Sequence, residues 1–111
     1  WGASSEINFL SQRHSPTQFH YGYPLIVPSE ITAEMVDDFM NDLNTNVPTL
    51  IVDTTVEDGM RVPPLDATTR AEWIADGGRS DVKNLQPVFT FVGQTCDKVE
   101  QIEEATIYRC D

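Results

Sequence analysis

The stretch EITAEMVDDFMNDLNTNVPTLIVD, residues 30–53, decides the fold of this chain, because it joins a helical pattern directly to a strand pattern. Ile31, Met35, Phe39 and Leu43 recur every four residues, which places them on one apolar stripe of a helix over Glu30–Asn44. Acidic side chains cover the opposite face of that helix. The pattern predicts that Met35, Phe39 and Leu43 are buried against the strand that follows.

That following strand, Thr49–Asp53, is short and continuously apolar up to its final aspartate. Such runs are typical of strands covered on both faces, so we expect a central strand of a parallel sheet. The aromatic alternation over Thr17–Tyr23 predicts an earlier strand. Strand, helix and strand would then form a βαβ unit with a right-handed crossover.

Three further helices are expected. The first covers Ser4–Arg13, and the second covers Thr68–Asp76, with Asp66 as its N-cap and Gly77-Gly78 as its left-handed stop. The third helix is expected over Leu85–Thr95. The composition of this segment also fits a strand, but the spacing of its apolar residues and a proline in the first turn favour a helix.

The C-terminal segment predicts a β-hairpin, with strands Asp97–Ile102 and Ala105–Cys110 on either side of a turn at Glu103-Glu104. The length fits one domain. The prediction is therefore a single α/β domain spanning residues 1–111. It has a small mixed β-sheet with a right-handed βαβ unit and a C-terminal hairpin, and its helices pack on the sheet.

The charge balance limits the classes of partner. Eighteen acidic residues against seven basic ones give a net charge of −11. A chain this acidic repels phosphate backbones, so nucleic-acid binding is excluded. No stretch approaches the roughly 18 consecutive apolar residues of a membrane-spanning helix. No nucleophile with a base and no ligand cluster stands out, so we expect no catalytic residue, no metal and no cofactor.

Two places could bind a ligand. Arg13, His20 and Tyr21 belong to a polar and aromatic group around the first turn, of the kind that binds a sugar or a phosphate. The same residues would also form an ordinary loop rim. Asp53 ends the buried strand, where α/β domains place ligands, although an aspartate there also serves to start a turn.

The chain has two cysteines, Cys96 and Cys110. Counting outward from the turn at Glu103-Glu104 places Asp97 opposite Cys110, so that Cys96 is one residue out of register. A β-bulge would absorb that difference and allow a disulfide across the hairpin. Two separate buried thiols remain the alternative.

Several pieces of the sequence together resemble a segment of prokaryotic polytopic membrane glycosyltransferases related to the protein O-mannosyltransferases. In those enzymes the segment follows a strand. The matching pieces here are Trp1-Gly2, F-L-S-Q-R (9–13), Y-P-L (23–25), an N-x-N-x-P helix end leading to I-V-D (44–53), and a final I-Y-R (107–109). Cys96 and Cys110 depart from the family, which has an aromatic and a basic residue there.

The resemblance implies a non-catalytic extracytoplasmic domain of a longer membrane protein, placed after its membrane helices. The catalytic aspartate of that family lies in a loop that this chain does not contain. The implied partners are the transmembrane part of the same polypeptide and, through it, a polyprenyl-phosphate sugar or an acceptor. The implied location, the extracytoplasmic face of the cell membrane, would also favour a disulfide. The alternative is an independent binding module of a cell-surface protein.

Overall fold

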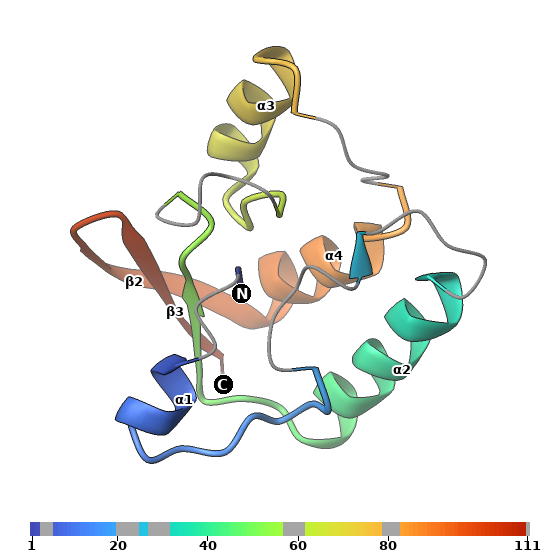
Figure 1. Ribbon diagram of the computed structural model, residues 1–111, viewed down its shortest axis with the longest axis vertical. Coiled ribbons are helices and arrows are strands. Elements are labelled where there is room, and N and C mark those ends of the chain that lie inside the picture. The colour runs from blue at the N-terminus through green and yellow to red at the C-terminus, as the bar shows by residue number, and fades with distance from the viewer. Residues whose placement is uncertain (3–5, 20–24, 27–31, 57–61, 79–82, 111) are drawn as a thin grey trace.

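A computed structural model describes residues 1–2, 6–19, 25–26, 32–56, 62–78 and 83–110 of the chain. Figure 1 shows how the elements are arranged. In chain order they are α1 (Glu6–Leu10), α2 (Thr32–Thr45), β1 (Leu50–Asp53), α3 (Ala67–Ala75), α4 (Gln86–Thr95), β2 (Cys96–Ile102) and β3 (Ala105–Cys110). The α/β class, the helices expected from local patterns and the C-terminal hairpin are confirmed.

The three strands form one antiparallel sheet in the order β1-β3-β2. Strand β1 pairs with β3 from Leu50↔Arg109 to Asp53↔Thr106. The expectation of a central strand in a parallel sheet was therefore wrong for β1, which is an edge strand with an antiparallel neighbour. An apolar run indicates that a strand is covered, but not which strand lies beside it, because pairing is a long-range property.

The earlier strand expected over Thr17–Tyr23 is not seen in the residues that can be described. Residues 16–18 form a bend, and the Thr17 hydroxyl donates to the Phe19 carbonyl at 3.1 Å. Residues 20–23 lie outside the described residues. The βαβ unit therefore has no counterpart in the described part of the chain.

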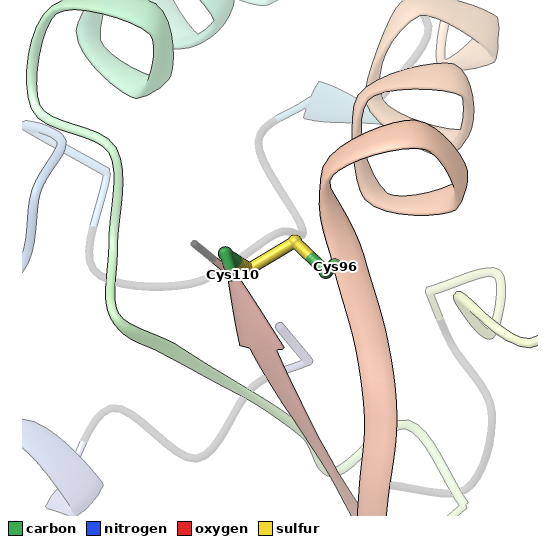
Figure 2. The surroundings of a disulfide bond; sticks show 2 residues. All are labelled: Cys96 and Cys110. Carbon is green, nitrogen blue, oxygen red and sulfur yellow. A yellow bond between two sulfur atoms is a disulfide. The ribbon is translucent and has the colours of Figure 1, made fainter.

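The hairpin has the register that a disulfide needs. Cys96 is paired with Cys110, and Asp97 is paired with Arg109 rather than with Cys110. A register shift between Lys98 and Glu100 supplies the bulge that this pairing requires. The two sulfurs are bonded at 2.05 Å, with α-carbons 4.0 Å apart. Figure 2 shows the bridge at the point where α4 runs into β2, beside the end of β3.

Helix α2 buries most of the stripe that the sequence predicts. Phe39 and Leu43 are buried, whereas Met35 is only half-buried and Val36 is buried instead. The nearest rings to Phe39 are those of Trp1 and Phe19, each with its centroid 5.9 Å away. Ile51 of β1 packs against the same core cluster as Phe39 and Leu43, as the sequence predicts. Aromatic side chains from the N-terminal segment lie against the helix.

Helix α3 begins and ends as its flanking residues predict. The Asp66 carboxylate accepts from the Thr69 backbone N–H at 2.9 Å, which is an N-cap. At the other end, Gly77 has a φ of 86° and its N–H donates to the Ile74 carbonyl. The Gly78 N–H donates to the Trp73 carbonyl at 2.8 Å. These two bonds form a Schellman motif.

Helix α4 supplies the largest share of the core. Its proline lies in the first turn, and the helix buries Val88, Phe89, Phe91 and Val92. Their partners in one continuous cluster come from α2, from β3 and from the loops. These are Leu25, Val36, Phe39, Leu43, Leu65, Leu85 and Tyr108.

Candidate functional site

A cleft of about 880 Å³ lies along strand β1. Leu50, Ile51 and Val52 of β1 line it, together with Phe39 and Leu43 of α2. The α4 side chains Val88 and Val92 also reach it. These walls are mostly apolar, so the cleft suits an apolar or amphipathic occupant.

The rim of the cleft carries two basic side chains, Arg13 and His14, on the loop that follows α1. Both side chains are exposed. The Arg13 backbone N–H donates to the Asn8 carbonyl at 3.0 Å, which closes the end of α1 and fixes where the loop leaves the helix. Of the binding residues expected from the sequence, Arg13 is the one found at this cleft. His20 and Tyr21 lie outside the described residues.

Trp1 is fixed beside the cleft by both its backbone and its side chain. Its amine donates to the Val52 carbonyl at 2.6 Å, and its indole Nε1 donates to the Pro63 carbonyl at 2.7 Å. The Thr54 backbone N–H in turn donates to the Trp1 carbonyl at 2.9 Å. Sequence reasoning quoted Trp1 only as part of a motif, because no local pattern shows that the first residue pairs with one about fifty positions later.

Asp53 has a structural role at the end of β1. Its carboxylate accepts from the Thr55 N–H at 3.0 Å and from the Leu65 N–H at 2.8 Å. The side chain is 5% exposed. It does not line the large cleft but a separate cavity of about 120 Å³, shared with Asp66 and Lys98. The sequence left two roles open for Asp53, binding a ligand or starting a turn, and these hydrogen bonds to backbone N–H groups are those of a turn residue.

Arg70 holds the same loop from the other side, and sequence reasoning missed it. Its guanidinium Nη1 donates to the Pro64 and Leu65 carbonyls at 3.0 and 2.7 Å. The guanidinium carbon Cζ lies 3.8 Å from the centre of the Phe89 ring. Burial lowers the pKa of Arg70 from its ordinary value. The signal that could have found it is its position four residues after the Asp66 cap.

Tyr108 is a second buried group near this loop. Burial, with the Asp53 and Asp66 charges, raises the pKa of its phenol above the ordinary value. Among the described residues, its hydroxyl has no hydrogen-bond partner. Tyr108 and Asp53 are buried beneath the loop, and the half-buried Arg70 lies beside them; none of the three lines the cleft.

The described residues contain no group of three or more His, Cys, Asp or Glu that could hold a metal ion. Among the helices described, none is both long and apolar enough to cross a bilayer. The disulfide of Cys96 and Cys110 ties the end of β3 to the start of β2 and takes both thiols.

Comparison with known proteins gives no relative: no family model, no curated protein and no solved structure matches this chain.

Proposed function

We propose that this chain is a non-catalytic extracytoplasmic domain of a polytopic membrane glycosyltransferase that uses a lipid-linked sugar. In this proposal the domain packs on the transmembrane part of its own polypeptide and shapes access for the acceptor or the donor. The chemistry belongs to the membrane part, where the related enzymes carry their catalytic aspartate.

The observation that carries the proposal is the convergence of the pieces that resemble that family. Trp1 bonds to Val52 within the I-V-D piece. The final I-Y-R pairs with the same strand, Ile107 with Val52 and Arg109 with Leu50. Pieces at the two ends and in the middle of the chain therefore meet at one strand.

The surroundings of that strand support a role in packing and access. The F-L-S-Q-R piece ends at Arg13, on the rim of the cleft, and residues 46–48, which follow α2, line the same cleft. The exposed Arg13 guanidinium on this rim supports the proposal, because a guanidinium can bind the phosphate of a lipid-linked sugar.

The first test uses the isolated chain. Incubated with polyprenyl-phosphate mannose and a peptide acceptor, it is expected to transfer no sugar, while membranes that hold the longer polypeptide do transfer it. Transfer by the isolated chain would overturn the assignment of a non-catalytic domain.

The second test separates a transferase from an independent binding module of the cell surface. The gene upstream of Trp1 is expected to encode several membrane-spanning helices with an acidic first extracytoplasmic loop. A signal peptide and one membrane anchor in that place would contradict the transferase and favour the binding module.

A further inference from the structure

The outer edge of β1 carries a hydrogen-bond pattern that the described residues do not complete. The Trp1 amine donates to the Val52 carbonyl, and the Thr54 N–H donates to the Trp1 carbonyl. The two bonds therefore flank Asp53 on either side. Two parallel strands pair in this way, with one residue bonded to the neighbours of the residue opposite. Trp1 thus takes the position of the last residue of a strand parallel to β1.

The register of β1 shows which groups would continue this ladder. Thr49 accepts from the Cys110 N–H, so alternate residues Ile51 and Asp53 direct their backbone groups toward β3. Leu50 and Val52 direct theirs outward, as the bond from Trp1 to Val52 confirms. The Leu50 carbonyl and the Val52 N–H are therefore the next acceptor and donor along this edge.

The two edges of the sheet differ in how they resist pairing. The outer strand β2 carries the charged residues Asp97, Lys98 and Glu100 and a bulge, which are the features by which proteins protect a free edge. Strand β1 has neither feature over Leu50–Val52, and Leu50 is 44% exposed. An uncharged, regular and apolar edge is expected where another strand covers it.

The large cleft provides room at this edge. It is lined by Leu50–Val52 and also by Phe39 and Leu43 of α2. A strand laid there would bond to β1 through its backbone and bury apolar side chains against α2.

The geometry points to one occupant: the segment of the longer polypeptide that directly precedes Trp1 lies in this cleft as a strand parallel to β1. Strand β1 then becomes central and the sheet becomes mixed. The inference rests on the proposed function only in requiring a longer polypeptide. The family resemblance does not say where such a strand lies; the two hydrogen bonds of Trp1 and the register of β1 do.

The direction of this strand also orients the domain. A strand parallel to β1 enters beside Leu50, at the end of the sheet where β3 finishes at Cys110. Val47, which is 49% exposed, lies on the same approach to β1. This end of the sheet therefore faces the upstream part of the polypeptide.

Amide hydrogen exchange measured by NMR tests the inference. One sample is the 111-residue chain. A second sample carries the native segment of about eight residues that precedes Trp1, enough for a strand of roughly 26 Å. A third carries a Gly/Ser segment of equal length, which stays flexible. The β2 and β3 amides report that each sample is folded.

In the sample with the native segment, the Leu50 and Val52 amides are expected to exchange at least about tenfold more slowly than with the Gly/Ser segment. The Ile51 amide, which faces β3, is the internal control and is expected to change less. Equal exchange of Leu50 and Val52 in the two extended samples would overturn the inference. Protection of Val52 that rises with protein concentration in the 111-residue chain would also overturn it, because a second copy would then be the occupant. None of these outcomes depends on sugar transfer, so failure here leaves the transferase test to stand or fall separately.

Discussion

The glycines after α3 and within α4 occupy very different surroundings. A β-carbon on Gly78 would meet the Trp73 side chain and would lie 2.5 Å from the Trp73 carbonyl oxygen. A β-carbon on Gly93 would meet nothing within 4 Å, and this residue lies on the exposed face of a helix. The same substitution should therefore have opposite effects at the two positions.

We predict that Gly78→Ala destabilises the protein by about 1–3 kcal/mol, because Trp73 and the helix end must shift. Gly93→Ala is its matched control and should stabilise by about 0.5–1 kcal/mol, since alanine loses less backbone entropy in a helix. Urea unfolding of both variants gives the two free energies. Equal effects would mean that the Schellman end of α3 is not formed in solution.

At the scale of single residues, the sequence indicates which side chains could bind a ligand or form a turn, but it does not indicate which distant residues they contact. The sequence placed Asp53 at the end of a buried strand but left open whether it binds a ligand or forms a turn. The deciding contact is the hydrogen bond that its carboxylate accepts from the N–H of Leu65, twelve residues away. Arg13 was predicted as the last residue of the first helix, whereas α1 ends at Leu10 and Arg13 lies on the loop that follows. That Arg13 lines the same cleft as Leu50 could not be predicted from the sequence. The role of Asp53 and the place of Arg13 at the cleft both depend on contacts between distant segments.

The N-cap of α3 makes the stability of one element depend on pH. The Thr69 backbone N–H, aided by the Thr69 hydroxyl and by Lys98, holds the pKa of Asp66 below its ordinary value of 3.8. A carboxyl group with a lowered folded-state pKa stabilises the fold fully above its unfolded-state pKa. It loses that contribution as the pH falls through the folded-state pKa.

We therefore predict that part of the unfolding free energy disappears as the pH falls from about 5 to below the folded-state pKa of Asp66. Asp66→Asn keeps a capping oxygen without the charge, so its stability should depend less on pH over this range. Asp66→Ala should cost about 0.5–2 kcal/mol at neutral pH. Urea melts between pH 3 and pH 7 provide the comparison, and identical pH slopes for the native chain and Asp66→Asn would refute the role of the charge.

Helix α2 offers a matched pair of neighbouring positions. Phe39 is 9% exposed and lies between the Trp1 and Phe19 rings, whereas Asp38 is exposed. Phe39→Ala should cost about 3–5 kcal/mol through the cavity it leaves. Asp38→Ala should change stability by less than about 0.5 kcal/mol. Similar urea midpoints for the two variants would mean that the buried face of α2 has been misassigned.

At the scale of elements, local signals were sufficient for the helices and the hairpin. Asp66 and Gly77 mark the two ends of α3, and Pro87 fits the first turn of α4. The pattern finds the buried face of α2, where Phe39 and Leu43 are buried as predicted, but it does not predict that Val36 is buried more deeply than Met35. The bulge in β2 was needed to bring Cys96 opposite Cys110, and that register could be counted because the turn between the strands is short.

At the scale of the whole molecule, the pairing of β1 is where the sequence was least informative. Its apolar composition predicts cover on both sides, yet in this chain β3 pairs with one edge while Trp1 bonds to the end of the other. The composition and the observed edge position agree once a further strand is laid in the cleft. The antiparallel partner β3 could not be predicted, since it lies more than fifty residues along the chain.

The central claim is that this domain serves a membrane transferase without carrying its chemistry. The most direct measurement is the rate of sugar transfer from polyprenyl-phosphate mannose in membranes that contain the longer polypeptide, with and without residues 1–111. We predict that deletion lowers the rate by about a hundredfold, because the acceptor or donor is no longer positioned, while the remaining membrane part is still inserted and still binds the lipid-linked donor. Lys83→Ala, which changes an exposed cation away from the cleft, is the control and should leave the rate unchanged. An unchanged rate after deletion of the domain would contradict the account.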